Sequence, residues 1–337
     1  MDRRVALTLA TGFTSAVVVC FALFAEAPQG CVKGDCINGP GERVFPDGNR
    51  LIVSFKKGMP EGQGKIQYAD GGTYEGTFVA GKQQGYGTRN WPGQALYRGQ
   101  WLQGRIHGQG SIRFASGTTQ EGFFQNGMLE GKGKSTLSNG GTYAGDFSAG
   151  RFSGKGTLKT PRVTYEGTFK SGRADGKGKA VWTDGSSAEG DFRSGKPHGS
   201  CNVRYANGNH FEGEWKDGRP DGQGKYSWAD GAVYTGGFSA GMPEGEGEFV
   251  AEDRNYKGSF KSGLYSGKGV LGTKAGNRYE GDFEKGSPHG RGVYTFKSGT
   301  VYEGDFRDGK FNGKGTLKFK DGTTQEGTFK DGQFTGK

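Results

Sequence analysis

A repeat with a period of 23 residues constrains the fold of this chain more than any other feature. Aligned on Tyr-Glu-Gly, thirteen repeats follow one another, and two of them are shortened to 22 residues. They begin at Leu51, Tyr74, Tyr97, Gln120, Tyr143, Tyr165, Ala188, Phe211, Tyr234, Tyr256, Tyr279, Tyr302 and Gln325. An uninterrupted short repeat predicts a linear array in which each member packs mainly on its neighbours.

Four columns of the repeat explain an unusual composition, in which 69 of 337 residues are glycine. The third, eighth, twelfth and fourteenth positions hold 49 of these glycines, with Val53 and Cys201 as exceptions, and the fifth position is aromatic in all thirteen repeats. The glycines lack the every-third spacing of collagen, and so many aromatic residues argue against a disordered linker. We expect the glycines to form turns and to leave flat space on which rings lie.

Each repeat is predicted to be one β-hairpin. Apolar and polar residues alternate with a period of two, as in residues 317–320, which predicts half-buried strands. The segment between two invariant glycines, such as Gly195 to Gly199, predicts one turn. Asp-Gly or Asn-Gly pairs predict a second turn at residues 70–71, 139–140, 184–185, 207–208, 230–231 and 321–322. The array is then an all-β, single-layer antiparallel sheet on the order of 120 Å long at ~4.8 Å per strand.

The string Tyr-Glu-Gly-x-Phe-x-x-Gly-Lys-x-x-Gly-Lys-Gly, nearly complete in residues 165–178 and 302–315, resembles the MORN repeat. The match covers residues 51–337. The resemblance implies an elongated array of antiparallel hairpins with aromatic columns along one groove. It also implies a scaffold, a membrane-associated organiser or a dimerisation module, and lipid binding has been proposed for some members. Choline- and glucan-binding arrays also combine glycine with aromatic residues, but they lack the Gly-x-x-x-Gly-x-Gly spacing.

Residues 5–25 form an uncharged apolar stretch that is long enough to cross a bilayer as a helix. We expect an uncleaved signal anchor, because Pro28 directly follows the Ala-Glu-Ala sequence that resembles a cleavage site. A cleaved signal peptide and a buried core helix are the alternatives. Either signal places the repeats on the non-cytoplasmic side, periplasmic or extracellular. The predicted organisation is a signal segment (1–27), a cysteine-containing cap with half a repeat (28–50) and the array (51–337).

Two of the four cysteines lie just beyond the signal segment. A disulfide between Cys31 and Cys36 would protect the exposed first edge of the sheet, and an oxidising compartment would permit it. A pair of free thiols or a metal half-site is the alternative. Cys201 is interpreted as a small residue in a glycine column, and Cys20 belongs to the apolar stretch.

The spacing of the chemically reactive residues argues against catalysis. His107, His198 and His289 all occupy the eleventh position, and at ~10 Å per hairpin they would lie roughly 40 Å apart, too far to share a metal ion. The acidic second position is interpreted as a set of cross-strand partners for basic residues. Its members are Glu75, Glu121, Glu166, Glu189, Glu212, Glu280, Glu303 and Glu326. The glycine pairs lack the phosphate-loop pattern, so we predict a non-enzymatic protein without cofactor or metal.

The net charge of +10 permits attraction to anionic lipid headgroups, glycans or nucleic acid. Basic residues are densest in the last full repeat, where Arg307, Lys310, Lys314, Lys318 and Lys320 form a candidate binding face. Solubility alone is the competing explanation. We expect a membrane-anchored scaffold that binds proteins or a second copy of itself, or alternatively a binding module for anionic phospholipid headgroups or glycans. The expected compartment disfavours nucleic acid.

Overall fold

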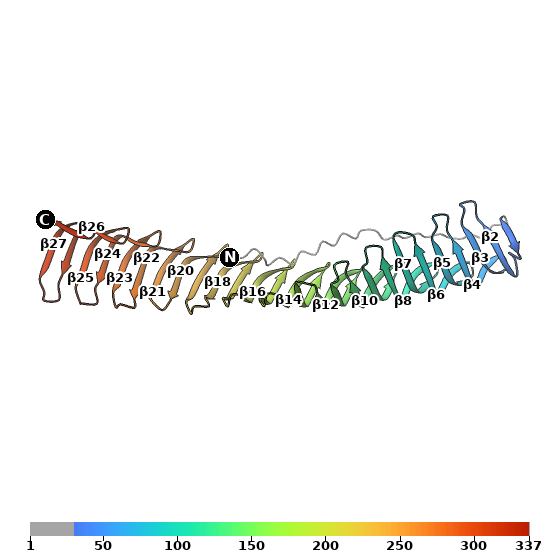
Figure 1. The fold of residues 1–337 in the computed structure, drawn as a ribbon, viewed down its shortest axis with the longest axis horizontal. Helices are drawn as coiled ribbons and strands as arrows, with labels where there is room; N and C mark the ends of the chain where they lie inside the picture. Colours follow the sequence, from blue (N-terminus) through green and yellow to red (C-terminus); the bar gives the residue numbers. More distant parts are fainter. Residues whose placement is uncertain (1–29, 337) are drawn as a thin grey trace. The chain divides into compact units, whose positions relative to one another are not determined.

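The computed structural model describes residues 30–336, and these residues form antiparallel β-structure without a helix. They divide into a first unit that ends at Thr183 and a second unit that begins at Asp184. Within each unit the strands pair in sequence order, with connections alternating between two edges (Figure 1). The predicted all-β antiparallel fold is confirmed. The anchor expected over residues 5–25 lies outside the described residues, and among those described no helix is long and apolar enough to cross a membrane.

Each unit contains fourteen strands. Those of the first unit are β1 (Cys31–Gly34), β2 (Pro40–Val44), β3 (Arg50–Lys56), β4 (Met59–Gln67), β5 (Thr73–Val79), β6 (Lys82–Trp91), β7 (Ala95–Leu102), β8 (Arg105–Phe114), β9 (Thr119–Gln125), β10 (Met128–Thr136), β11 (Thr142–Ser148), β12 (Arg151–Lys159), β13 (Val163–Lys170) and β14 (Arg173–Trp182). Those of the second unit are β15 (Ser187–Arg193), β16 (Lys196–Arg204), β17 (His210–Lys216), β18 (Arg219–Ser227), β19 (Val233–Ser239), β20 (Met242–Val250), β21 (Arg254–Lys261), β22 (Leu264–Thr273), β23 (Arg278–Glu284), β24 (Ser287–Thr295), β25 (Val301–Arg307), β26 (Lys310–Lys318), β27 (Thr324–Lys330) and β28 (Gln333–Gly336).

The seventh and eighth positions of each repeat form a tight turn. The seventh residue is never glycine, yet its φ lies between 46° and 51° in all thirteen repeats, and the φ of the glycine that follows lies between 72° and 92°. Two successive residues with positive φ make a type I′ turn, whose twist matches that of the strands. The turn expected across Gly195–Gly199 was therefore placed wrongly: Ser194 and Gly195 form it, and residues 196–199 belong to β16.

The twelfth glycine has a different role. Its φ is positive in every repeat that reaches it, and it lies where the hairpin register shifts, as Gly154 does between β11 and β12. The second set of predicted turns is confirmed at the opposite edge, where the Gly71 N–H donates to the Tyr68 carbonyl at 3.0 Å. Glycine supplies the positive φ in both places.

Aromatic rings cover one face of the sheet, which we call the ring face. Gly145 and Gly156 pair across a hairpin, and a Cβ on Gly156 would lie 2.6 Å from Cε2 of Tyr143. The Tyr143 ring contacts Phe147 edge-on, with centroids 5.1 Å apart, and Phe169 of the next repeat at 5.0 Å. The aromatic rings of the first and fifth positions are buried in this way in both units. The expectation that glycines make space for rings is confirmed.

The half repeat continues the sheet at its first edge. β1 pairs with β2, and β2 pairs with β3. In this structure a disulfide joins Cys31 to Cys36, with their Cα atoms 6.0 Å apart. Arg43 is buried, donates from Nη2 to the Cys36 carbonyl at 3.2 Å, and lies 4.9 Å from the centroid of Phe55. The cysteine loop is thereby tied to the first ring of the array.

The eleventh position links several hairpins to the turn of the next one. The Glu130 carboxylate accepts a hydrogen bond of 2.6 Å from the Ala149 N–H, which belongs to the following turn. The same bond is made by Glu61, Asp221 and Glu244. His198 occupies this place too, with Nδ1 3.5 Å from the Asp217 nitrogen. His198 therefore has a structural role at this place, and no group of three potential metal ligands occurs within residues 30–336.

Removing one of these links is expected to loosen one turn without unfolding the array. Glu130→Ala leaves the Ala149 N–H without its protein acceptor, a loss of about 1 kcal/mol for a hydrogen bond of this kind. Hydrogen exchange at the 148–151 turn should then accelerate about fivefold. Glu130→Gln keeps an acceptor and should exchange nearly as the parent does. Identical exchange in all three proteins would contradict the proposed link.

Candidate binding surfaces

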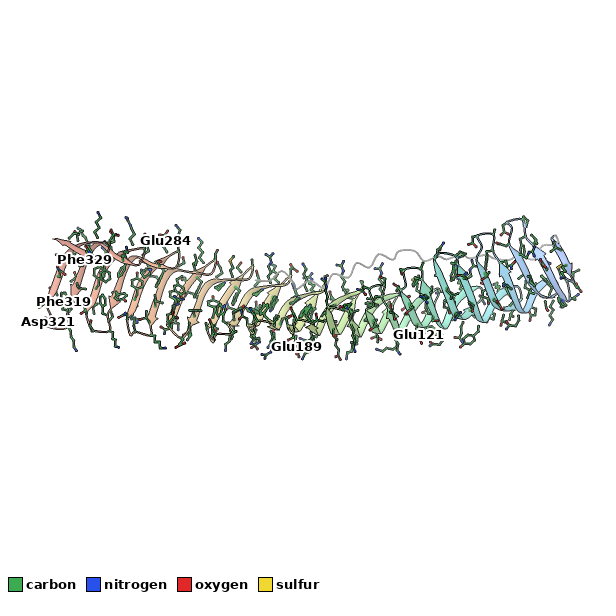
Figure 2. The ribbon with its side chains drawn as sticks, in the orientation of Figure 1. Glu121, Glu189, Glu284, Phe319, Asp321 and Phe329 are labelled. Carbon is green, nitrogen blue, oxygen red and sulfur yellow. A yellow bond between two sulfur atoms is a disulfide. The ribbon has the colours of Figure 1, made fainter. Side chains whose placement is uncertain are left out.

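Each unit has two faces and two edges: the ring face, the outer face opposite to it, the edge formed by positions six to nine of each repeat, which we call the turn edge, and the edge opposite to that one. In the second unit Glu284 and Phe329 lie toward the turn edge, whereas Phe319 and Asp321 lie at the opposite edge (Figure 2). Because the repeat is regular, each surface carries the same positions again in every hairpin.

The ring face has few polar groups available to a ligand. The hydroxyl of each first-position tyrosine is used internally, as Tyr143 donates to the Asp146 carbonyl at 2.8 Å and Tyr279 to that of Asp282 at 2.8 Å. Burial raises the pKa of Tyr256 to about 12, and the nearby Glu246 adds to the shift. These phenols are therefore neutral hydrogen-bond donors at physiological pH, and they hold the rings in place.

One buried cation on the ring face was not anticipated from the sequence. Arg89 stands at the sixteenth position, where most repeats carry an apolar residue, and it is only 6% exposed. Its guanidinium carbon lies 3.3 Å from the Tyr68 centroid and 5.2 Å from that of Trp91. Burial lowers its pKa, while Tyr68 and Asp70 oppose that shift. The two flanking rings stabilise the cation by cation–π contact.

The outer face is a ladder of opposite charges. Some members of the acidic second position lie opposite basic residues, as in the pairs Glu75 with Lys65 and Glu212 with Lys225. Glu280, Glu303 and Glu326 lie opposite valine or threonine instead. The register therefore agrees with the interpretation as cross-strand partners for part of this column only. The fourth and thirteenth positions also pair, and ion pairs form there, among them Lys132–Asp146 at 2.7 Å, Lys268–Asp282 at 2.8 Å and Arg291–Asp305 at 3.6 Å. Hydrogen bonding to Lys132 lowers the pKa of the Asp146 carboxyl.

The ladder is interrupted across β6–β9. Tyr86 pairs with Gln100 and Gln109 pairs with Phe123 at positions that elsewhere bear small, polar or charged side chains. Tyr86 is 65% exposed and Phe123 is 39% exposed. Sequence reasoning missed this feature, because the two rings are 37 residues apart and only the strand register brings them into one row. Nearby on β2–β5, an open hollow of about 440 Å³ is lined by Ile52 and other residues.

The turn edge of the first unit combines cations with apolar side chains. Its six hairpins present seven exposed basic residues at positions six to nine: Lys56, Lys57, Lys82, Arg105, Arg151, Lys170 and Arg173. They also present Met59, Val79, Leu102 and Met128, which are 37–47% exposed. None of these positions is acidic, and none of the seven cations forms an ion pair within the described part of the chain. Two carboxylates at the eleventh position of this unit, Glu61 and Glu130, accept hydrogen bonds from backbone N–H groups.

The basic residues predicted as a binding face in the last full repeat do not all share one surface. Arg307 and Lys310 lie directly opposite each other on the turn edge. Lys314 lies further along β26 and pairs with Thr328. Lys318 ends β26, and Lys320 lies in the turn that follows, at the other edge. All five are exposed, but only Arg307 and Lys310 are brought together as a pair.

The MORN repeat profile matches the chain thirteen times. The matches cover residues 29–50, 54–73, 74–94, 97–119, 121–142, 143–161, 165–187, 189–210, 211–233, 234–255, 256–278, 279–301 and 302–324. The first match falls on the segment interpreted as a cap and half repeat, and the others follow the predicted period. The thirteenfold MORN repeat is confirmed. No curated protein matches the chain at a significant level.

Solved structures show only distant likeness. The TCP domain of SAS-4 from Drosophila melanogaster is 14% identical, with 57% of this chain and 91% of that chain covered and a TM-score of 0.26. The TCP10 domain of CPAP from Danio rerio is 12% identical, with 86% and 99% covered and a TM-score of 0.19. At these values neither supports an argument about function.

Proposed function

The chain belongs to the MORN repeat family, and on that basis we propose that it is a non-enzymatic scaffold that binds a protein partner or a second copy of itself. One observation carries the proposal: every hairpin presents the same positions outward, so that each unit repeats one binding chemistry along its length. Repeated weak sites of this kind give avidity to a partner that spans several of them. Residues 5–25 would anchor this scaffold to a membrane, with the repeats on the non-cytoplasmic side.

Self-association is tested by sedimentation velocity of the full chain in mild detergent over a wide range of concentration. We expect a dimer fraction that rises with concentration, as mass action requires. A strictly monomeric protein at every concentration would exclude self-association. Binding of another protein would then be tested by photo-crosslinking from an exposed outer-face position such as Lys155, with buried Tyr143 as the control position.

A second candidate function is binding to an anionic phospholipid surface, and the turn edge of the first unit favours it. Seven exposed cations without acidic neighbours at the same positions would attract anionic headgroups. Met59, Val79, Leu102 and Met128 would enter the interfacial region between them. The sheet would therefore meet the bilayer by its edge, with both faces still free to bind other molecules.

Removing three of these cations is expected to weaken binding to anionic vesicles strongly. Lys82→Gln, Arg105→Gln and Arg151→Gln combined should reduce the affinity about 100-fold or more, at ~1 kcal/mol for each basic residue near the membrane. The readout is the difference in affinity between phosphatidylserine-containing vesicles and neutral vesicles. This difference is used because residues 5–25 would contribute to binding of both kinds of vesicle.

The matched control removes three outer-face cations from the same unit, by Lys65→Gln, Lys134→Gln and Lys155→Gln. It has the same net charge as the turn-edge variant and should keep most of the binding. Equal losses in the two variants would show a diffuse effect of net charge and would contradict the proposed edge. Binding by the parent should also weaken as salt rises.

A further inference from the structure

We propose that the outer face of the first unit binds an extended neutral glycan across β6–β9. This inference deepens the glycan-binding alternative, and it concerns a surface distinct from the turn edge. The site is the row formed by Tyr86, Gln100, Gln109 and Phe123, which we call the aromatic row.

The strand register makes the aromatic row continuous. Tyr86 lies opposite Gln100, and Gln109 lies opposite Phe123. The two glutamines meet between these pairs, because the Gln109 N–H donates to Oε1 of Gln100 at 2.7 Å. Three strand spacings separate the end residues, which places the rings roughly 14 Å apart on one face. The row therefore offers a ring, two amides and a second ring along the direction in which the strands stack.

Packing of the sheet does not explain the two rings. At the position of Tyr86, other repeats carry lysine, arginine, glutamine, serine or glutamate, and at the position of Phe123 they carry small or polar residues. Tyr86 stands between Gly85 and Gly87 and is 65% exposed. The Phe123 ring meets that of His107 edge-on, with centroids 5.6 Å apart. The two exposed rings lie in one row on either side of the β7–β8 hairpin, and together they offer a flat ligand two surfaces on which to stack.

The chemistry of the aromatic row fits a neutral polyhydroxylated ligand. Ring faces accept the flat C–H faces of sugars, and primary amides both donate to and accept from hydroxyl groups. Oε1 of Gln100 already accepts from the Gln109 N–H, so the NH₂ of this side chain is the group that would donate to a ligand hydroxyl. No charged residue lies within the row itself, in contrast to the Lys132–Asp146 pair between β10 and β11. The exposed Arg98 lies in the adjacent row, so an anionic ligand would have to reach beyond the aromatic row to form an ion pair.

The same features argue against a peptide as the occupant. β6, β7, β8 and β9 are paired on both sides, so that no strand edge is open for β-addition. A ligand would therefore lie flat on the aromatic row. Thr88 and Ser111 flank Arg98 in the adjacent row, and their hydroxyl groups would contact the side of this ligand.

The test is titration of the full chain with soluble neutral oligosaccharides, cellohexaose, chitohexaose and laminarihexaose, followed by calorimetry. We expect at least one to bind, and Tyr86→Ala and Phe123→Ala each to weaken it about tenfold. Phe319→Ala is the matched control, since Phe319 is a comparably exposed ring, at 38%, in the second unit. It should bind as the parent does. Circular dichroism would verify that the exposed positions leave the fold intact.

Several outcomes would overturn the proposal. Absence of binding by the parent to all three oligosaccharides is one, and equal affinity in Tyr86→Ala and the parent is another. If the parent binds no glycan, and if Tyr86→Ala or Phe123→Ala loses a photo-crosslink to a protein, the aromatic row would be assigned to a protein partner instead. The turn-edge variant Lys82→Gln, Arg105→Gln, Arg151→Gln should bind the oligosaccharide normally, so that failure of the vesicle experiment and failure of this one are distinguishable.

Discussion

Gly156→Ala is expected to destabilise its hairpin by about 3 kcal/mol, the upper part of the usual range for overpacking. The backbone at Gly156 does not have positive φ, so alanine itself is permitted there. The added Cβ would lie 2.6 Å from Cε2 of Tyr143. That ring is unable to retreat, because Phe152 stacks on it with centroids 3.8 Å apart and its hydroxyl is bonded to the Asp146 carbonyl. Urea unfolding and hydrogen exchange over β11–β13 would measure the loss.

The control for this prediction removes the ring. In a Tyr143→Leu background, the second substitution Gly156→Ala should cost less than about 1 kcal/mol, which gives a coupling of about 2 kcal/mol between the two sites. Such coupling would show that the glycine is needed for the ring and not for the turn. A Gly156→Ala protein as stable as the parent would contradict the packing described here. So would an equal loss in both backgrounds.

In two repeats of the chain, a larger residue replaces a column glycine and the first-position ring is missing. Val53 replaces the third-position glycine in the repeat that begins with Leu51, and Cys201 replaces the fourteenth-position glycine in the repeat that begins with Ala188. In both cases the first position lacks an aromatic ring. Cys201 is buried at 3% exposure and pairs with Gly190 and Gly213, which confirms its interpretation as a small residue in a small space.

The period of the repeat was sufficient to predict hairpins and strand order, because each side chain must alternate between two faces. It was not sufficient to place the tight turn. The seventh position carries Lys, Ala, Gln, Asn, Ser or Asp, so that no residue type marks its positive φ. The composition of residues 195–199 resembles a turn, yet Gly199 supplies the bulge and only Ser194–Gly195 reverse the chain.

The candidate surfaces were less accessible to sequence reasoning than the fold. Density of basic residues along the chain pointed to the last full repeat, where Lys320 lies at the edge opposite to Arg307. Surfaces of a hairpin array are built from columns and not from consecutive residues. The turn edge is recognised only when positions six to nine of successive hairpins are considered together. The pairing of Tyr86 and Phe123 with the two glutamines is seen only from the register of the paired strands.

Raising the pH from about 9 to about 11 is expected to destabilise the second unit strongly, through its buried tyrosines. Burial raises the pKa of Tyr205, Tyr234, Tyr256 and Tyr302 to about 12, and it raises the pKa of Tyr279 as well. In the unfolded chain these phenols ionise near pH 10. The stability they confer is therefore complete below about pH 10 and is lost as the pH rises through about 12.

The magnitude follows from linkage. At about pH 11 each unfolded tyrosine would gain up to ~1.4 kcal/mol by ionising, and we expect about 5 kcal/mol for the five together, because solvent near a single-layer sheet reduces each contribution. Urea unfolding at the two pH values, combined with tyrosinate absorbance, would measure this change. Ionisation of these five tyrosines near pH 10 without loss of structure would contradict the burial of their rings.

Tyrosine-to-phenylalanine variants separate this effect from the titration of lysines in the same pH range. Phe211 occupies the first position of its repeat and is fully buried, so the site accepts a ring without a hydroxyl. Tyr256→Phe and Tyr302→Phe together should cost about 2 kcal/mol at neutral pH, through loss of hydrogen bonds to the Ser259 and Asp305 carbonyls. They should also remove about two fifths of the alkaline loss. If the phenols are buried hydrogen-bond donors, the double variant will be less stable than the parent at neutral pH but will lose less stability at alkaline pH. An unchanged pH dependence would assign the alkaline loss of stability to lysine titration.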